Sequence, residues 1–276
     1  MKFSKYHALG NDYIVINPKD LNCPLSLTDI KTICDRHYGI GSDGILYGPE
    51  ASDSCDFSLQ IFNPDASEAE KSGNGLRIFS RYLWDQSLVS HSTFTIQTKG
   101  GVVSAKVGEK GLSVAVGMGK VRFTHEAIGE PKAQSQKLCI QGNEFTYYLA
   151  SVGNPHCVIF LDEIDEAIAK KFGPAIENEA RFPNRTNVQF VRVINRSSIQ
   201  IEIWERGAGY TLASGSSSTA AASVACSLGF CDPNINVHMP GGVINIQLDT
   251  QFYATMLGDV RKICVGDFCR EALDSR

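Results

Sequence analysis

The chain has 276 residues, of which 43% are hydrophobic and 20% charged, and its formal net charge is −4. This composition is typical of an ordinary globular protein. The chain is long enough for one large domain or two, and its core needs no metal ion or disulfide bond to be stable. The slightly acidic charge, without a basic stripe or tail, argues against a nucleic-acid or membrane-surface partner.

The first half of the chain reads as short strands with two helices among them. β-branched or alternating runs bounded by turn residues predict strands over 12–17, 56–63, 92–98, 101–107 and 112–118. A helix is predicted over 27–39, capped by Ser26 or Thr28. A second helix is predicted after Gly75, where apolar residues recur at helical spacing.

The second half has the same character. Strands are predicted over 144–152, 156–161, 186–194, 198–205, 242–248 and 252–258. One helix is predicted over 162–173, ending at Gly173, and another after Ser217. The latter is small and apolar on every side, as buried helices are. Each half is therefore expected to be a curved, mainly antiparallel sheet around one central helix, in an α+β fold.

Four pairs of segments recur in the same order at a nearly constant offset of about 140 residues. LGNDYIVIN at Leu9 resembles VGNPHCVIF at Val152, and Ser72 in EKSGNG falls opposite Ser214 in LASGSS. Four ordered matches indicate a duplication, and the period is too long for a solenoid. We therefore expect two pseudo-twofold domains, 1–118 and 119–262.

The N-terminus and the cysteines favour a cytoplasmic protein. Residues 1–17 lack the long apolar segment of a signal peptide, and no apolar run is long enough to span a bilayer. The nine cysteines are odd in number, form no CxxC pair and fit no common zinc spacing. We expect reduced, mostly buried thiols and no bound metal.

Both central helices are expected to begin at a Gly-rich turn, SGNG at Ser72 and SGSS at Ser214. Helix N-termini bind carboxylates, because they present unpaired N–H groups and a partial positive charge. If the two halves face each other, one ligand would be held from both sides. Serine is also among the best helix caps, so either turn alone is best read as a cap, and only the matched pair favours a site. Neither turn is a P-loop, and no GxGxxG follows a strand, so a nucleotide cofactor is not indicated.

Other polar residues occupy matched positions of the repeat. Asn11 and Asn154 each follow a glycine just ahead of a strand, and Asn63 and Glu205 end matched strands. Asparagine donates and accepts at once, which suits a zwitterionic amino acid, and Arg206 suits a carboxylate. His156 in GNPHC, taken alone, is more often structural than catalytic.

Five segments carry a family resemblance: KYHALGNDYIVIN, NPDASEAEKSGNGLR, SVGNPHCVIF, RTNVQFV and WERGAGYTLASGSSSTAAA. They resemble the motifs of the diaminopimelate epimerases, in that family's order and over nearly the whole chain. Proline racemases and phenazine-pathway isomerases share the fold but usually lack this combination. The resemblance implies interconversion of LL- and meso-diaminopimelate, in lysine and peptidoglycan precursor synthesis, without metal or pyridoxal phosphate. It also implies a C-terminal tail, 263–276, that returns to the first domain, and in many members a homodimer.

The resemblance also implies residue roles. Two cysteines, one per domain, flank the α-carbon: one removes the α-proton as thiolate and the other reprotonates the opposite face. By motif these positions are Ser72 and Ser214 here, with His156 and Glu205 as the polar neighbours that assist them. The substrate contacts implied are Asn11, Asn63, Gly73, Asn74, Asn154, Asn187, Glu205, Arg206, Gly215 and Ser216.

The chain departs from this pattern at both reactive positions, because serine stands where the family has cysteine. A thiol titrates near ~8.5 and falls further at a helix N-terminus, whereas a serine hydroxyl is almost never ionised. Without a strong adjacent base, serine does not remove an α-proton at a useful rate. A smaller departure is Gly44, where many members carry glutamine.

Three accounts of the two serines are open. The chain is an engineered Cys-to-Ser form that holds substrate without turnover, which we favour, or a natural variant that uses other groups with altered or broader amino-acid specificity, for example as a glutamate racemase. In the third account it is a non-catalytic binder of diaminopimelate or a related amino acid. No lysine stands out as a Schiff-base residue for a racemase that uses pyridoxal phosphate.

Overall fold

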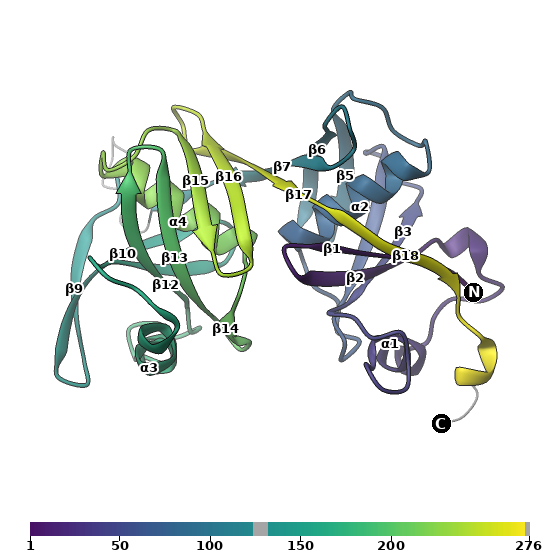
Figure 1. The fold of residues 1–276 in the computed structure, drawn as a ribbon, viewed down its shortest axis with the longest axis horizontal. Helices are drawn as coiled ribbons and strands as arrows, with labels where there is room; N and C mark the ends of the chain where they lie inside the picture. Colours follow the sequence, from purple (N-terminus) through teal and green to yellow (C-terminus); the bar gives the residue numbers. More distant parts are fainter. Residues whose placement is uncertain (124–131, 274–276) are drawn as a thin grey trace. The chain divides into compact units, whose positions relative to one another are not determined.

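The computed structural model describes residues 1–123 and 132–273. Its contacts divide the chain into two compact units: unit 1 is Met1–Val116 with the segment from Gly258 onward, and unit 2 is Gly117–Leu257 (Figure 1). Within the described ranges, no helix has the length and apolar character needed to cross a membrane.

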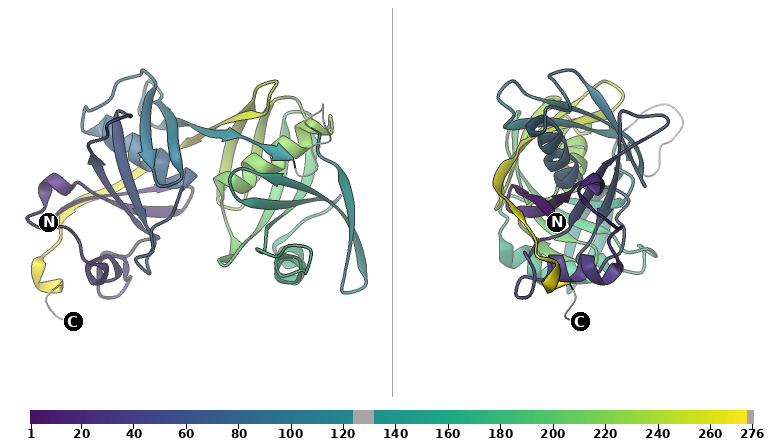
Figure 2. Two further views of the ribbon diagram at one scale, coloured as in Figure 1. Left: turned by 180° about the vertical axis from the view of Figure 1, so that it is seen from behind. Right: turned by 90° about the vertical axis from the view of Figure 1, so that its right-hand side faces the viewer.

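Unit 1 is a curved sheet around helix α2 (Gly73–Asp85), as Figures 1 and 2 show. The neighbouring strands follow the order β18, β1, β2, β3, β4, β5, β6, β7 and pair antiparallel, except that β2–β3 and β4–β5 are parallel. The strands are β1 (Lys2–Ala8), β2 (Asn11–Ile16), β3 (Ile45–Glu50), β4 (Phe57–Phe62), β5 (Phe94–Thr98), β6 (Gly101–Val107), β7 (Ser113–Lys120) and β18 (Arg261–Asp267). Helix α1 (Leu27–Cys34) and the 3-10 turns η1 (Pro18–Asp20) and η2 (Arg270–Ala272) complete the unit.

Unit 2 has the same plan around helix α4 (Gly215–Ser227). From β9 the order is β9, β10, β11, β12, β13, β15, β16, β17, with β11–β12 and β13–β15 parallel and the other pairs antiparallel. The strands are β8 (Arg122–Phe123), β9 (Ser135–Ile140), β10 (Asn143–Ser151), β11 (Pro155–Phe160), β12 (Asn187–Asn195), β13 (Ser198–Glu205), β14 (Gly209–Thr211), β15 (Asn234–Met239), β16 (Gly242–Leu248) and β17 (Tyr253–Asp259). Helix α3 (Glu166–Glu177) lies between β11 and β12 in the chain.

The two units share one order of main strands and helices, which confirms the predicted α+β class with duplicated sheets around central helices. In both, the first parallel pair is joined through a peripheral helix, α1 between β2 and β3 or α3 between β11 and β12. The second parallel pair is joined through the central helix, α2 or α4. In each unit, the connection that leaves the first strand of this second pair therefore runs into the N-terminus of the central helix.

The two central helices are buried in different ways. Helix α2 turns a stripe of large side chains inward, including Leu76, Ile78, Phe79 and Leu83, each with no exposed surface. Helix α4 is buried on nearly every side, and its buried residues from Gly215 to Ala225 are small. Small side chains allow the surrounding strands to approach the helix axis closely, so the all-round apolar pattern correctly predicted a buried helix.

The peripheral helices refine two expectations. Ser26 caps α1 in a reciprocal capping box with Asp29, which decides between the two expected caps. The prediction that the helix of unit 2 ends at Gly173 is wrong, because α3 continues to Glu177 with Pro174 inside it. Gly173 is required by space: a Cβ there would lie 2.5 Å from Cγ of Trp204. This glycine marks a helix packed tightly on β13, not a helix end.

Candidate functional site

The two serines at matched positions are helix N-caps of the same geometry. Ser72 precedes α2 with φ −135° and ψ 116°, and Ser214 precedes α4 with φ −145° and ψ 126°. Each side-chain oxygen accepts from the N–H three residues on: Gly75 to Ser72 at 3.0 Å, and Ser217 to Ser214 at 3.4 Å. Each serine thus presents its hydroxyl at the positive end of its central helix.

The first residues of both helices leave their N–H groups outside the helical hydrogen-bond ladder. In α2 these are Gly73 and Asn74, and in α4 they are Gly215 and Ser216. The Ser216 hydroxyl also lies 3.5 Å from that of Ser214. Each unit therefore offers a serine hydroxyl next to free backbone donors, an arrangement suited to a carboxylate ligand.

In unit 1, a line of hydrogen bonds with fixed direction joins Asn74 to Asn11. Arg77, a fully buried guanidinium, donates to Oδ1 of Asn74; Nδ2 of Asn74 donates to Oδ1 of Asn11 at 3.0 Å; and Nδ2 of Asn11 donates to Asp43 at 2.8 Å. Arginine only donates and an ionised carboxylate only accepts, so the two ends determine which way both amides point.

The carboxylate end of this line belongs to a network of ion pairs that joins β1 and β2 to the segment between α1 and β3. Arg36 contacts both Asp43 at 2.7 Å and Asp12 at 2.8 Å, and Lys5 lies 2.9 Å from Asp12. Hydrogen bonds and charge from Arg36 and Lys5 outweigh burial and lower the pKa of Asp12. The network thus favours the ionised form of the Asp12 carboxyl group, next to Asn11 in the chain.

Asn63, the remaining unit 1 candidate, is held by its own turn. Its side-chain amide donates to Oγ of Ser67 at 3.0 Å, and its backbone N–H donates to the Ser67 carbonyl at 2.8 Å. Both partners lie just after β4, so the hydrogen bonds found for Asn63 among the described residues do not join it to Asn74 or Asn11. It keeps the predicted place at the end of β4.

In unit 2, Asn187 connects the start of β11 to the turn after β13. Its Nδ2 donates to the Pro155 carbonyl at 2.9 Å, and its Oδ1 accepts from the Arg206 backbone N–H at 3.0 Å. Glu205 accepts from the Thr211 hydroxyl at 3.3 Å. The fold thus brings Asn187, Glu205 and Arg206, three of the predicted residues, to one place.

A residue that the sequence analysis missed, Glu177, anchors the same turn. This buried carboxylate at the end of α3 accepts from the Trp204 indole at 2.7 Å, from the Gly207 N–H at 2.9 Å and from Arg185 at 3.0 Å. Its contacts therefore bracket Glu205 and Arg206 on both sides. Tyr13, Asp43, Arg77 and Glu177 were all missed as site residues; Tyr13 and Arg77 lie within the segments that carry the family resemblance, whereas Asp43 and Glu177 lie outside them.

His156 is completely buried at the start of β11 beside Asn154, with its Nε2 2.9 Å from Oδ1 of that residue. Burial, aided by the positive charge of Arg206, lowers the pKa of His156 to about 3. The imidazole is therefore neutral at physiological pH.

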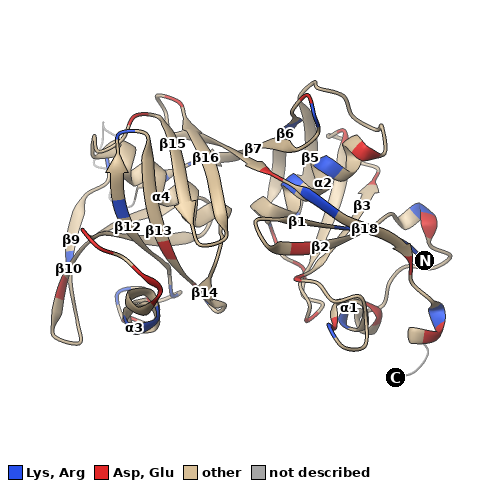
Figure 3. Ribbon diagram, viewed as in Figure 1, with Lys and Arg blue, Asp and Glu red and all other residues tan. Residues whose placement is uncertain are grey.

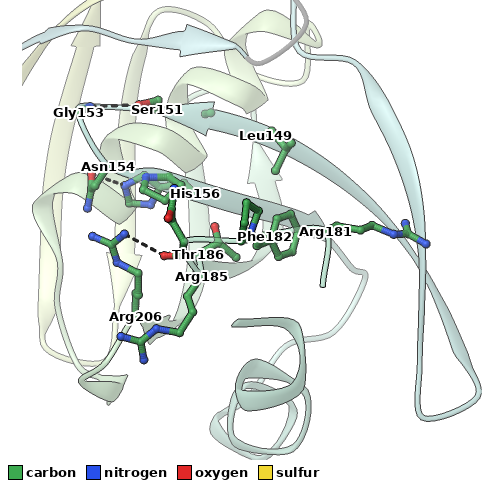
Figure 4. A pocket seen from close by; sticks show the side chains of 14 residues that line it. Leu149, Ser151, Gly153, Asn154, His156, Arg181, Phe182, Arg185, Thr186 and Arg206 are labelled. Atoms are coloured by element: carbon green, nitrogen blue, oxygen red, sulfur yellow. Dashed lines mark hydrogen bonds between the residues drawn. The ribbon is translucent and has the colours of Figure 1, made fainter. Parts of the chain in front are cut away.

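A pocket of about 700 Å³ opens beside these residues in unit 2 (Figure 4). Three predicted residues, Asn154, His156 and Arg206, line it together with Arg181 and Arg185. The Arg206 guanidinium donates to the Asn184 carbonyl at 3.2 Å and has no carboxylate partner among the described residues. Over the same residues, no group of three or more His, Cys, Asp or Glu side chains is placed to hold a metal ion.

Comparisons with known proteins agree on one family. The family model described as diaminopimelate epimerase matches residues 3–124 and 148–263. The chain is 57% identical to "Diaminopimelate epimerase 2" of Nostoc sp. strain PCC 7120 over 275 residues, covering 98% of this chain and 96% of that protein. It is 37% identical to a diaminopimelate epimerase of Alkaliphilus metalliredigens over 274 residues, covering 96% of each.

Solved structures share the fold at low sequence identity. A hydroxyproline epimerase from Agrobacterium vitis matches with a TM-score of 0.71 at 14% identity, covering 100% of this chain and 92% of that one. A phenazine biosynthesis protein of the PhzF family from Bacillus anthracis matches with a TM-score of 0.70 at 12% identity, covering 98% of this chain and 99% of that one. The family model and the curated relatives, which span nearly the whole chain, show that this protein belongs to the diaminopimelate epimerase family.

Proposed function

We propose that the chain carries the site of a diaminopimelate epimerase, which interconverts LL- and meso-2,6-diaminopimelate by two-base proton transfer at the α-carbon. The observation that supports this most is the matched pair of N-caps, Ser72 on α2 and Ser214 on α4. Each stands at the position where the family places a proton-transferring residue. The relatives at 57% and 37% identity carry this activity in their names.

Substrate binding follows from the groups around the two caps. The free N–H groups of Gly73, Asn74, Gly215 and Ser216 suit a carboxylate. The amides of Asn11, Asn63, Asn154 and Asn187 serve the ammonium and carboxylate groups of a zwitterion, because each amide both donates and accepts. Arg206 pairs with a carboxylate and Glu205 with an ammonium group.

Serine at both positions binds well and transfers protons poorly. Removing an α-proton takes a base, and a helix N-terminus produces one from a thiol by stabilising the thiolate. A hydroxyl stays protonated at the same place. Neutral His156 and Glu205 are the assisting groups, but neither makes Ser72 or Ser214 ionise. We therefore expect the chain as written to bind diaminopimelate with little turnover.

We further propose that the protein is a cytoplasmic, cofactor-independent enzyme that forms a homodimer and acts on a small amino-acid substrate. The nine cysteines, each a free thiol, suit a reducing compartment, but the expectation that most are buried is wrong, because only Cys34, Cys157 and Cys231 are. Acidic and basic residues are interspersed on the elements of both units (Figure 3), and the net charge is −4, which does not favour a nucleic-acid or membrane-surface partner.

The test restores the thiols. The double variant Ser72→Cys/Ser214→Cys is expected to exchange the α-hydrogen of diaminopimelate with solvent deuterium and to convert the LL into the meso isomer. Because general-base catalysis contributes about 10²–10⁴ in rate, we expect a gain of at least ~100-fold over the chain as written. Proton NMR in D₂O follows both processes at once.

The single variants Ser72→Cys and Ser214→Cys are the controls, since two-base transfer needs both positions. Calorimetry on the chain as written measures binding without turnover. A doubly restored protein that binds diaminopimelate and exchanges nothing contradicts the epimerase assignment and leaves a binding protein. Equal exchange with glutamate instead indicates a broader amino-acid racemase.

A further inference from the structure

The hydroxyl of Tyr13, a residue of β2, lies 3.2 Å from Oγ of Ser72. Tyr13 is 6% exposed, and it lies on β2, whose residues from Asp12 to Ile16 are all buried. Oγ of Ser72 also accepts the 3.0 Å hydrogen bond from the Gly75 N–H. The group at position 72 therefore meets two protein hydrogen-bonding groups, one from its own helix and one from a strand 59 residues earlier.

Gly44 leaves the space that the Tyr13 ring fills. A Cβ at position 44 would lie 2.7 Å from Cε1 of that ring and 2.5 Å from the Phe62 carbonyl oxygen. The Gly44 backbone cannot shift freely, because its carbonyl accepts from the Ile14 N–H at 3.1 Å and from the Ser42 hydroxyl at 2.9 Å. The φ angle of Gly44 is not in the left-handed region, so space, and not backbone conformation, requires glycine here.

The duplication gives this pair a counterpart in unit 2. In the matched segments LGNDYIVIN and VGNPHCVIF, Tyr13 corresponds to His156. In the parallel pair β2–β3, Ile14 faces Ile45, so Tyr13, one residue earlier, corresponds in register to Gly44. In the equivalent pair β11–β12, His156 faces Asn187. Gly44 therefore stands to Tyr13 as Asn187 stands to His156. Tyr13 and Gly44 thus occupy in unit 1 the places that two candidate site residues occupy in unit 2.

We propose that Tyr13 is a positioning residue of the site: its hydroxyl donates to the group at position 72, and Gly44 keeps the room that its ring needs. The inference rests on the proposed function, in which position 72 is one of the two proton-transferring positions. The Gly75 N–H can only donate, and a charged group at position 72 can only accept, so Tyr13 must then donate as well. Position 214, whose oxygen accepts at 3.4 Å from Ser217, has no tyrosine among its hydrogen-bond partners in the described structure.

Serine and cysteine at position 72 respond differently to this donation. With serine, the Tyr13 bond and the Gly75 bond take the lone pairs of Oγ and leave the serine proton free to point at a ligand. With cysteine, the same two donors stabilise the thiolate, because hydrogen bonds to a charged acceptor are the stronger ones. Tyr13 therefore makes a thiol at position 72 more acidic.

The test measures the ionisation of the thiol introduced by the single substitution Ser72→Cys. The rate of iodoacetamide alkylation at position 72, quantified by peptide mass spectrometry because nine other cysteines are present, is followed against pH. The midpoint of this curve is the apparent pKa of the thiol at position 72. Adding Tyr13→Phe, which keeps the ring and removes the donor, is expected to raise this midpoint by about one pH unit. Lys71, the charged neighbour in the chain, is the same in both proteins, so its effect cancels.

Tyr82→Phe, on a buried tyrosine of α2, is the matched control and is expected to leave the midpoint where it was. Gly44→Ala is expected to raise the midpoint when Tyr13 is present and to add nothing when residue 13 is phenylalanine. An unchanged midpoint in Tyr13→Phe overturns the proposal, whether or not the alanine variant folds. Alkylation needs no diaminopimelate, so the result is independent of whether the doubly restored protein proves to be an epimerase.

Discussion

At the scale of single residues, the buried imidazole of His156 is the clearest case of a side chain whose chemistry burial has changed. Its pKa falls from an ordinary 6.5 to about 3, so the folded protein keeps it neutral over the whole physiological range. The unfolded chain, by contrast, protonates this residue below about pH 6.5. Stability from the neutral imidazole is therefore complete above that pH and is lost as the pH falls from 6.5 toward 3.

Replacing His156 is expected to remove part of this acid sensitivity. Between pH 7 and pH 5 the free energy of unfolding of the chain as written should fall by about 1–2 kcal/mol more than that of His156→Asn. Urea unfolding at the two pH values measures the difference. The exposed His37→Asn serves as control and should retain the full acid sensitivity. Parallel pH profiles for the original chain and His156→Asn would show that the imidazole is not held neutral.

At the scale of elements, helix α3 determines the shape of the turn that carries Glu205 and Arg206. Gly173 lets the helix lie against the Trp204 ring, and the Glu177 carboxylate then takes three donors from the turn and its surroundings. In the sequence Gly173 has the appearance of a helix terminator and Glu177 carries no signal, and the role of both residues follows only from the contact between α3 and β13. An element outside the candidate site thus fixes the backbone within it.

Glu177→Gln tests this role. The amide keeps the size of the side chain but turns one acceptor into a donor, facing either the Trp204 indole or the Gly207 N–H. We expect a loss of about 1–3 kcal/mol in the free energy of unfolding, with weaker diaminopimelate binding by calorimetry. The matched Glu179→Gln, two residues on, removes only a half-exposed contact with Arg181 at 3.7 Å and should cost less than ~1 kcal/mol. Equal losses in the two variants would exclude the anchoring role.

At the scale of the whole molecule, the chain enters unit 1, passes through unit 2 and re-enters unit 1 with its last strand. Strand β18 pairs antiparallel with β1 from Lys2↔Asp267 to His7↔Arg261, and Lys262 lies 3.3 Å from Asp85 on α2. The sheet of unit 1 is therefore completed only by the C-terminal segment, whereas unit 2 is continuous in sequence.

Ending the chain after Val260 is expected to destabilise unit 1 and spare unit 2. Each unit holds one of the two tryptophans, Trp84 in α2 and Trp204 in β13, so single-tryptophan versions report the units separately. With Trp204→Phe, the urea midpoint seen through Trp84 should drop on truncation. With Trp84→Phe, the midpoint seen through Trp204 should stay near that of its full-length counterpart. A common drop in both signals would mean that the units unfold as one.

The sequence by itself determined the duplicated architecture, the two central helices and the two serine caps. These features are local or periodic: an apolar stripe in α2, a small-residue helix in α4, and capping serines before glycines all follow from the chain's own spacing. Some strands, such as β1, β3 and β15, were not predicted, because their pairing depends on partners distant in sequence. The end of α3 was predicted wrongly, because Gly173, which the close contact with Trp204 requires, has the appearance of a helix terminator in the sequence.

Only the tertiary structure decided which polar groups support the candidate site. Asp43 and Arg77 orient Asn11 and Asn74 from opposite ends of one line of hydrogen bonds, and Tyr13 reaches Ser72 from a strand that reads as plain core. Hydrogen bonds across such sequence separations have no periodic signature, since they exist only once the sheet has curved around α2. The sequence specifies which side chain stands at each position, but the packed fold decides which side chains contact one another.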